Sequence, residues 1–151
     1  MKKKRSVLPA IKSRFARFRL RTGYSRIYRI GVYALEDIPA RRLVIEYTGK
    51  RLNWEKATQL RFPQDIYLAR VKSGYVLDGG VAGSGAQLAN HSCNPNMKKK
   101  YSQGRMFLAS TKKILAGEEL TWDYNYPVNL RRVPCRCGAR NCRGTFRIII
   151  E

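Results

Sequence analysis

The sequence predicts a mostly β fold, and three observations lead to this prediction. Short runs rich in β-branched and aromatic residues recur along the chain, bounded by turn-forming residues. Residues 53–60 are the one clear candidate for a short helix, with Asn53 as its N-cap and Pro63 beyond its end. The chain has 151 residues, 44% of them hydrophobic, which suits a single domain with a real core.

The expected strands follow one another with short connections. A turn at residues 72–74 is expected to join the strands at 66–71 and 75–77 into a hairpin. A loose glycine-rich stretch, residues 79–85, comes next, and Ala116-Gly117 is the turn before the last strand. The expected strands are residues 32–35, 43–47, 66–71, 75–77, 105–110 and 119–123.

Residues 1–23 have the character of a basic arm. From Met1 to Leu35 there are eleven basic residues and no acidic residue. Ile11, Phe15 and Phe18 recur at near-helical spacing with basic residues between them. This pattern predicts an amphipathic basic helix, and a frayed basic tail is the alternative.

The charge of the whole chain is strongly positive. Thirty-one Lys and Arg against ten Asp and Glu give a formal net charge of +21. Such a field favours polyanions such as nucleic acid, while the plain alternative is a solvated basic face. No apolar run approaches the ~18–20 residues that cross a bilayer. The early residues lack the continuous apolar segment of a secretory signal, so we expect a protein that stays inside the cell.

The four cysteines predict a metal site. Cys135, Cys137 and Cys142 lie within eight residues, and three thiols so close suit a tight zinc knuckle, because Zn²⁺ prefers a closed tetrahedral shell. Cys93 is the favoured fourth ligand, although His91, the one histidine, competes for that place. A buried apolar role for Cys93 is the structural alternative.

Two further segments carry polar and aromatic residues in unusual density. Residues 90–96, Asn-His-Ser-Cys-Asn-Pro-Asn, are polar or turn-forming throughout, so we do not expect a regular strand there. In residues 118–126 the aromatic side chains fall at positions 122, 124 and 126, on one face of an extended segment. Taken alone, that stripe is more typical of a hydrophobic core than of a functional site.

Together these motifs resemble the SET-domain family of protein lysine methyltransferases with its post-SET zinc segment. The resemblance rests on residues 90–96, on Gly-Glu-Glu-Leu-Thr-Trp-Asp-Tyr at 117–124 and on Cys-x-Cys-x4-Cys-Arg-Gly at 135–144. Gly-Val-Tyr-Ala at 31–34 and Val-Ile-Glu-Tyr-Thr-Gly at 44–49 match the family's opening strands, and the order agrees over roughly residues 25–146.

The resemblance implies small curved β-sheets with a knot-like C-terminal segment that brings residues 90–91 beside Tyr124. It divides the chain into a basic arm at 1–23, a SET domain at 24–128 and a post-SET zinc segment at 129–151. The family pattern usually has glycine at position 29 and a basic residue at position 87, where this chain has Arg29 and Gln87.

The resemblance also implies a reaction, the transfer of a methyl group from S-adenosylmethionine to a lysine of a protein. Tyr124 matches the active-site tyrosine, Tyr47 lines the lysine channel, and Trp122 stands where relatives control the number of methyl groups. The zinc held by Cys93, Cys135, Cys137 and Cys142 is structural. The implied cofactor-binding residues are Arg29, Ile30, Gly31, Asn90, His91, Tyr124 and, over the adenine, Phe146.

The resemblance makes a histone or another basic chromatin protein the expected substrate. It places the protein in the nucleus of a eukaryote or the cytoplasm of a bacterium. A second hypothesis is a catalytically weak SET-like module that binds nucleic acid through its basic arm. The two hypotheses are compatible, since a basic surface can hold an enzyme on DNA while it methylates a nearby lysine.

Overall fold

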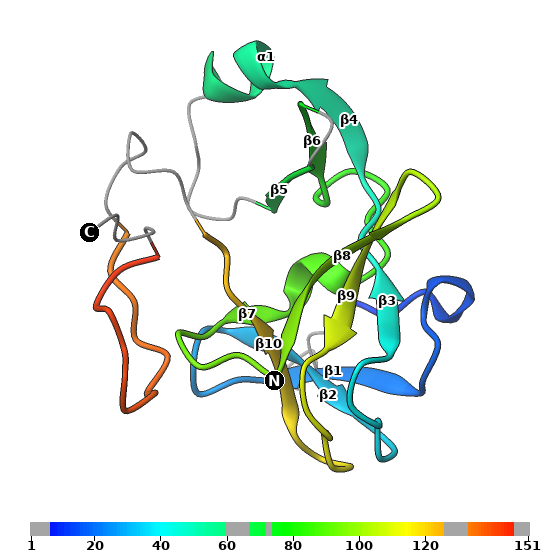
Figure 1. Cartoon of the computed structure of the whole chain (residues 1–151), viewed down its shortest axis with the longest axis vertical. Helices are drawn as coiled ribbons and strands as arrows, with labels where there is room; N and C mark the ends of the chain where they lie inside the picture. Colours follow the sequence, from blue (N-terminus) through cyan, green and yellow to red (C-terminus); the bar gives the residue numbers. More distant parts are fainter. Residues whose placement is uncertain (1–6, 60–66, 72–73, 126–132, 147–151) are drawn as a thin grey trace, which may run out of the picture.

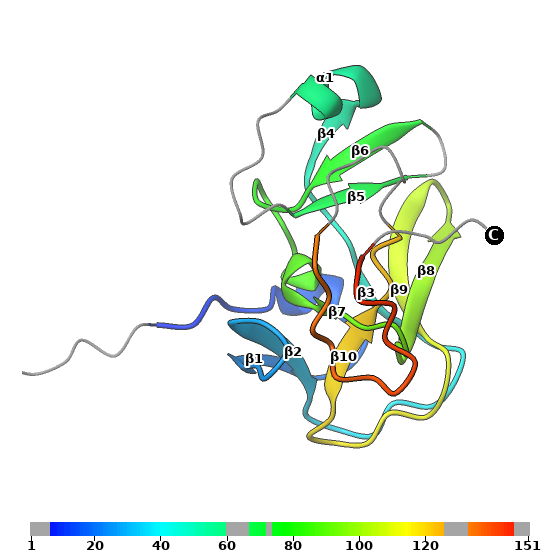
Figure 2. The same ribbon diagram turned by 90° about the vertical axis from the view of Figure 1, so that its left-hand side faces the viewer.

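Two β-sheets of unequal size form the body of the structure, a computed structural model that describes residues 7–59, 67–71, 74–125 and 133–146 (Figures 1 and 2). The larger sheet contains β1 (Leu20–Tyr24), β2 (Ile30–Ala34), β3 (Leu43–Glu46), β7 (Asn90–His91), β8 (Met97–Ser102), β9 (Arg105–Ser110) and β10 (Glu119–Trp122). The smaller sheet contains β4 (Lys50–Asn53), β5 (Leu68–Arg70) and β6 (Tyr75–Asp78). The helical elements are α1 (Trp54–Gln59) and the 3₁₀ turns Ser13–Phe15 and Ala86–Leu88.

Strand β10 is the junction of the larger sheet. It pairs antiparallel with β2 and parallel with both β7 and β8. The registers place Thr121 opposite Asn90 and Trp122 opposite His91. The segment that follows Trp122 therefore lies beside Asn90–His91, as the resemblance implied, although the two are some thirty residues apart in sequence.

The expected mostly β fold is confirmed, and most expected elements lie where the sequence placed them. The Oδ1 atom of Asn53 accepts a hydrogen bond from the Lys56 N–H at 2.8 Å, so Asn53 caps α1 as predicted. Strand β9 has the predicted bounds, and β3, β5, β6 and β10 fall within about a residue or two of theirs. Residues 72–73 of the predicted hairpin turn lie outside the described residues.

The predicted helix in the basic arm is wrong. Ala16 is extended and forms a bridge with Ile45, residues 17 and 18 make a bend, and Leu20–Tyr24 is the edge strand β1, paired along its length with β2. Ala16, Phe18 and Leu20 pack against the core, while the alternate residues Arg17 and Arg19 are exposed. This alternation has the period of a strand, and burial of three apolar side chains outweighed the weaker helical spacing.

The expectation that residues 90–96 contain no strand is also wrong for the first two. Asn90 and His91 form β7, because the backbone of β10 provides the ladder partner that the sequence does not reveal. Two strands were not expected at all, β4 and β8. Strand β8 pairs with β9 along its whole length through a two-residue turn at Gln103-Gly104.

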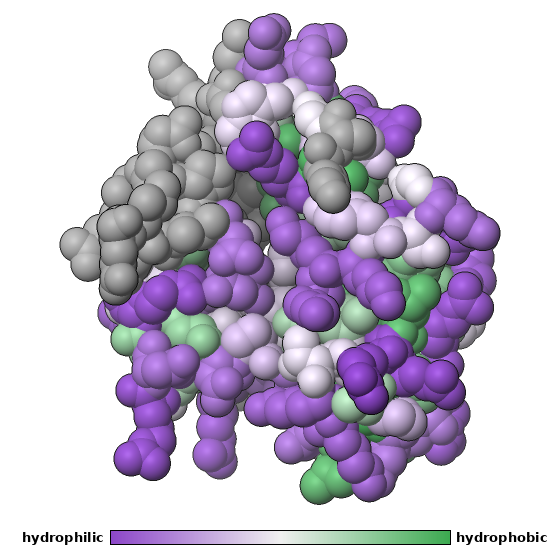
Figure 3. Space-filling view, viewed as in Figure 1, coloured by the Kyte–Doolittle hydropathy of each residue, from purple (hydrophilic) through white to green (hydrophobic). Residues whose placement is uncertain are grey.

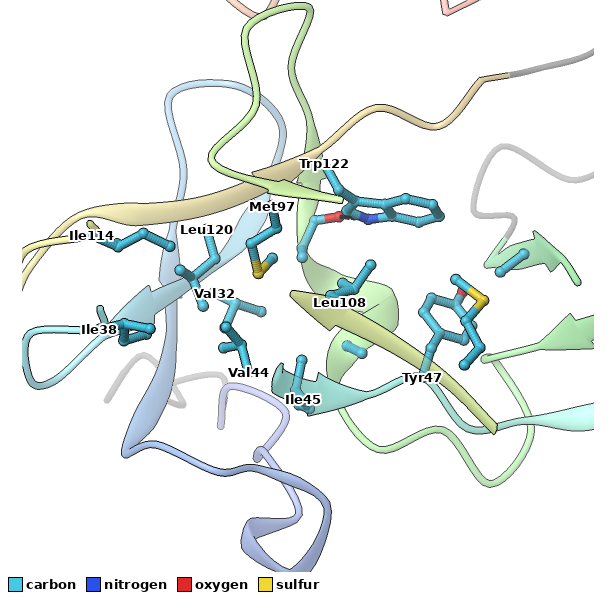
Figure 4. Close-up of a cluster of buried hydrophobic side chains, with 14 of the residues drawn as sticks. Val32, Ile38, Val44, Ile45, Tyr47, Met97, Leu108, Ile114, Leu120 and Trp122 are labelled. Carbon is cyan, nitrogen blue, oxygen red and sulfur yellow. Dashed lines mark hydrogen bonds between the residues drawn. The ribbon is translucent and has the colours of Figure 1, made fainter. Parts of the chain in front are cut away.

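The hydrophobic core lies between the strands of the larger sheet and the segments that cross it (Figure 4). Val32, Val44, Leu108 and Leu120 are nearly or fully buried at its centre. Trp122 and Tyr47 stand together at one end of this cluster in Figure 4. The core thus ends in an aromatic wall, which belongs to the candidate site. Among the described residues, no helix is long and apolar enough to span a bilayer.

Candidate active site and zinc cluster

Five ring-bearing side chains from four segments meet at the end of the core. The Trp122 ring lies 6.0 Å from the ring of Tyr47 and 5.0 Å from that of Tyr124, measured between centroids. The rings of His91 and Phe146 lie 5.3 Å from Tyr124, and 4.6 Å from each other. The contacts are tilted or edge-on, the arrangements that aromatic quadrupoles favour. This cluster forms a rigid apolar wall with polar tips.

Two polar groups of the cluster, from Tyr124 and Trp122, donate hydrogen bonds to the backbone just before β7. The Tyr124 hydroxyl donates to the Ala89 carbonyl oxygen at 3.0 Å, and Trp122 Nε1 donates to the same oxygen at 3.2 Å. The Tyr47 hydroxyl donates to the Tyr67 carbonyl oxygen at 2.6 Å. These bonds fix the ring orientations, so the phenol of Tyr124 is held directly beside Asn90.

Asn90 anchors a ring of oxygen acceptors next to Tyr124. Its side-chain nitrogen donates to the carbonyl oxygens of Tyr28 and Ile30, both at 3.1 Å, and to Glu119 Oε1 at 2.9 Å. The hydroxyl of Ser25 donates to the same carboxylate at 2.7 Å. Sequence reasoning gave neither Glu119 nor Ser25 a role in this network, although Glu119 lies within the motif at 117–124.

Gly31 is required by this network. A Cβ atom there would collide with the carboxylate of Glu119. The Glu119 carboxylate occupies the space that a Cβ atom at position 31 would need. Arg29 has a positive φ of 38°, a backbone conformation that explains why glycine is usual at this position. Its guanidinium lies over the Tyr28 ring at 5.1 Å.

His91 is buried and neutral. Burial, and secondarily the charge of Arg143, lower the pKa of His91 to about 4, against the opposing effect of Asp123. Its Nδ1 accepts the Tyr124 N–H at 3.1 Å, which leaves the hydrogen on Nε2, 3.3 Å from Cys93 Sγ. His91 thus ties the backbone of Tyr124 to the cysteine cluster.

The four cysteines come together although Cys93 is more than forty residues from the other three. Their sulfur atoms all lie within 4.8 Å of one another, and Cys93 Sγ is 3.8 Å from Cys135 Sγ. A tetrahedron with Zn–S bonds of about 2.3 Å has edges of about 3.8 Å, so the spacing fits zinc. His91 lies outside this set and contacts Cys93.

The surroundings of the sulfurs also fit a metal held by thiolates. The backbone N–H groups of Cys93, Arg143 and Gly144 donate to Cys137 Sγ, Cys93 Sγ and Cys142 Sγ at 3.3–3.4 Å. Burial raises the pKa of the Cys93 and Cys135 thiols in the metal-free chain. Burial acts the same way on Cys137, but hydrogen bonds from Cys93 and Ala139 outweigh it and lower its pKa to about 6. Four sulfurs and their N–H donors form a closed site typical of structural zinc.

An ion pair joins the cysteine segment to the aromatic wall. The guanidinium of Arg143 donates to both carboxylate oxygens of Asp123, at 2.7 and 2.9 Å. Asp123 lies between Trp122 and Tyr124, and Arg143 directly follows Cys142. The cysteine segment and the end of β10 lie side by side in Figure 2. The ion pair thus links the cysteine segment to the residue that precedes Tyr124.

Comparison with known proteins gives this geometry a family. The family model described as "SET domain" matches residues 29–125, which is more than half of the chain. The chain belongs to the SET domain family. The matched residues include Ile30, Asn90, Glu119 and Tyr124.

Curated relatives of this SET domain are much longer proteins. Histone-lysine N-methyltransferase SETD1B of Xenopus tropicalis is 36% identical over 143 residues, which cover 88% of this chain and 7% of the relative. Histone-lysine N-methyltransferase SETD1A of Homo sapiens is 35% identical, with 88% and 8% covered. The chain therefore spans less than a tenth of the length of these relatives.

Solved structures share the fold. The crystal structure of KRYPTONITE in complex with mCHH DNA, an H3(1–15) peptide and SAH has a TM-score of 0.72 and 27% identity, covering 87% of this chain and 30% of that one. Arabidopsis thaliana SUVH6 in complex with SAM has a TM-score of 0.76 at 22% identity, covering 89% and 34%. At 22% identity, the likeness to SUVH6 shows only the fold.

The SET domain brings most of the predicted site residues together. Tyr47, Trp122, Tyr124, His91 and Phe146 share one cluster, and Asn90 ties Ile30 to it. Gln87 is engaged locally, since its Oε1 accepts the Gly85 N–H at 2.8 Å. The roles of these residues, and the division of the chain at 23 and 128, stay predictions.

Proposed function

We propose that the chain is an S-adenosylmethionine-dependent protein-lysine N-methyltransferase that acts on a histone or another basic chromatin protein. The observation that carries the proposal is the position of Tyr124. Its hydroxyl is held beside Asn90, at the point where the aromatic wall meets the ring of oxygen acceptors. A methyl donor on one side and a lysine on the other would meet there.

The residues around Asn90 suit this cofactor. The acceptor oxygens of Tyr28, Ile30 and Glu119 favour a ligand that carries an ammonium and a sulfonium. The Arg29 guanidinium supplies a cation for its carboxylate, and Phe146 an apolar surface for its adenine. When bound, S-adenosylmethionine supplies an electrophilic methyl group. No residue of the chain has to act as a nucleophile.

The residues of the chain would orient the acceptor amine and keep it neutral. Tyr47, Trp122 and Tyr124 form the walls of a narrow apolar channel, which disfavours an ammonium and favours the amine. The Tyr124 hydroxyl would direct the lone pair toward the methyl group. Orientation of this kind accounts for about 7–11 kcal/mol in ideal systems.

A labelled-methyl assay tests the proposal. The probe is an H3(1–15) peptide, because a structural neighbour holds that peptide. Wild-type protein is expected to transfer label to lysine, and Tyr124→Phe to lower the rate by about 100-fold or more with little change in cofactor affinity. Tyr24→Phe is the matched control, since Tyr24 is exposed on β1. Wild-type activity in Tyr124→Phe, or no transfer to any basic protein by the wild type, would reject the proposal.

A second proposed activity is nucleic-acid binding through the N-terminal segment. Arg14, Arg17, Arg21 and Arg26 are exposed, and the face drawn in Figure 3 is largely hydrophilic. Such a surface would hold the enzyme on chromatin, in the nucleus if the source is eukaryotic. It would also offset the repulsion between a basic enzyme and a basic tail.

Salt dependence tests the second activity. The variant replaces residues 2–5, four consecutive basic residues of the N-terminal arm, by Gln. The log–log slope of duplex DNA affinity against salt should become shallower, by about 0.9 for each phosphate that the variant no longer neutralises. The rate on free peptide is the control and should not change. An unchanged slope excludes these residues from the DNA-binding surface.

A further inference from the structure

Lys99 stands apart from the other lysines because it lies against the aromatic wall. It follows the core residue Met97 on the same face of β8, and Met97 is the register partner of Trp122. The Lys99 Nζ atom lies 5.7 Å from the centroid of the Trp122 ring. It also donates to the Arg70 carbonyl oxygen at 3.4 Å. The neighbouring lysines Lys98 and Lys100 point outward and are exposed.

The charged groups around Lys99 compensate its ammonium poorly. Burial lowers the pKa of Lys99 first, the Arg70 guanidinium on β5 lowers it further, and Asp123 beyond β10 opposes both. The carboxylate of Asp123 is already bound by both arms of Arg143. Tyr101, also on β8, contributes a neutral hydroxyl that shares the Arg70 carbonyl. Among the described residues, the face of Trp122 supports the ammonium through a cation–π contact, in addition to the Arg70 carbonyl oxygen.

We propose that Lys99 and the acceptor lysine form a like-charged pair at Trp122 that shares a single proton. The inference rests on the proposed function, which makes Trp122 a wall of the acceptor channel. The ammonium groups of Lys99 and of the acceptor lysine would both lie against the Trp122 ring, where little water screens their repulsion. The pair therefore loses one proton to solvent more readily than an isolated lysine does. Lys99 keeps the shared proton, because its ammonium faces the Trp122 ring and donates to the Arg70 carbonyl oxygen. The acceptor is then left as the neutral amine that methyl transfer requires, without a general base.

The pH dependence of methyl transfer tests this role. The variants are Lys99→Met, which removes the charge, Lys99→Arg, which keeps it, and Lys100→Met as the exposed control. With the H3(1–15) peptide, Lys99→Met is expected to lower kcat/KM about tenfold near pH 7.5. The rising part of the curve of kcat/KM against pH should move to higher pH by about one unit. Its rates should approach those of the wild type above about pH 10.

The controls separate charge from structure. Lys99→Arg should keep the rising limb at or below its wild-type position, and Lys100→Met should match the wild type. A fall of kcat/KM in Lys99→Met that is equal at every pH would show a structural role and overturn the proposal. A rise in activity would show that Lys99 merely obstructs the channel, and would overturn it as well.

A binding measurement tests the pair independently of turnover. Titration calorimetry in buffers of different ionisation enthalpy counts the protons released when a peptide binds. At pH 8, binding of a peptide with the acceptor lysine should release up to about one proton from the wild type and much less from Lys99→Met. A peptide with norleucine in place of that lysine should release almost no protons from either protein. Equal release from both proteins refutes the pair. Proton release without methyl transfer would instead reject the proposed function and leave the pair standing.

Discussion

At the scale of single residues, Arg29 stands at a position where the family usually has glycine, and the difference strains the backbone locally. Its φ of 38° lies in the left-handed region, where the Cβ of a non-glycine residue crowds the backbone. The turn is held by a hydrogen bond from the Ser25 N–H to the Arg29 carbonyl at 3.0 Å. The side chain that causes the crowding also supplies a guanidinium beside the proposed cofactor site.

This conformation predicts an ordered series at position 29. Arg29→Gly should keep the free energy of unfolding within about 1 kcal/mol of the wild type, since relief of strain offsets the added freedom of the unfolded chain. Arg29→Val should lower it by about 1–3 kcal/mol, because a β-branched residue tolerates positive φ poorly. Urea unfolding with zinc present measures both.

Arg26→Val serves as the matched control for that series, because Arg26 is exposed and has no positive φ. It should change stability by less than about 0.5 kcal/mol. If Arg29→Val is as stable as Arg26→Val, the backbone at position 29 carries no strain. In that case the preference for glycine there has another origin.

At the scale of elements, the sequence contained signals for two strands that were not predicted. Ala16, Phe18 and Leu20 alternate with arginines, a period of two that argues against the helix suggested by the looser spacing of Ile11 and Phe15, although only Leu20 lies within β1. For β8, the run Met-Lys-Lys-Lys-Tyr-Ser has little intrinsic strand preference.

The hairpin signal for β8 lies in the next two residues. Gln103 and Gly104 have positive φ angles of 50° and 71°, as in the two-residue turns that suit the strand twist. Strand β8 is thus fixed by its turn and by pairing with the strongly apolar β9. Tertiary pairing of this kind outweighs local propensity and is the hardest part to foresee.

The candidate site was predictable where chemistry fixes the residue type. Thiols at close spacing indicate a metal, so Cys135, Cys137 and Cys142 were evident from sequence alone. Groups whose role depends on a distant partner were not evident. Asp123 and Arg143 are twenty residues apart and both have ordinary surface chemistry, so only the fold reveals that they meet.

The Asp123–Arg143 pair predicts measurable coupling between β10 and the cysteine segment. Each side chain is 22% exposed, and the two make two charge-assisted hydrogen bonds, so the pair is better shielded than a surface ion pair. A double-mutant cycle of Asp123→Asn and Arg143→Met should give a coupling free energy of about 1–3 kcal/mol in zinc-containing buffer. Urea unfolding is the measurement.

The Arg19–Glu36 pair provides the comparison for this cycle. Its side chains are 73% and 36% exposed, so the coupling should be well under 1 kcal/mol. A coupling of the same size in both cycles would mean that Arg143 does not fasten the cysteine segment to the aromatic wall. Tyr124 would then be linked to the cysteine segment through His91 and the ring of Phe146.

At the scale of the whole molecule, the four-cysteine cluster joins the described C-terminal segment, residues 133–146, to the sheet. The cysteine segment is held to itself by few backbone bonds, among them Cys135 N–H to Gly144 O at 3.0 Å and Phe146 N–H to Val133 O at 3.2 Å. Its attachment to the sheet depends on Cys93, Asp123 and the ring of Phe146. A segment with so few contacts gains its order from the metal.

Metal analysis and cobalt substitution test this dependence. The protein should contain about one zinc ion per chain, and Co²⁺ in its place should show the intense visible absorption of a tetrahedral four-thiolate site. Cys93→Ser should weaken and shift that spectrum, whereas His91→Gln should keep it, since His91 only contacts Cys93 Sγ.

Chelation should release the ordered ring of Phe146 while most of the sheet stays folded. Near-ultraviolet circular dichroism would report the loss of order around the ring, and far-ultraviolet circular dichroism the strands that remain. A normal four-thiolate spectrum in Cys93→Ser would exclude Cys93 as a ligand, and with it the link from the metal through β7 to Tyr124.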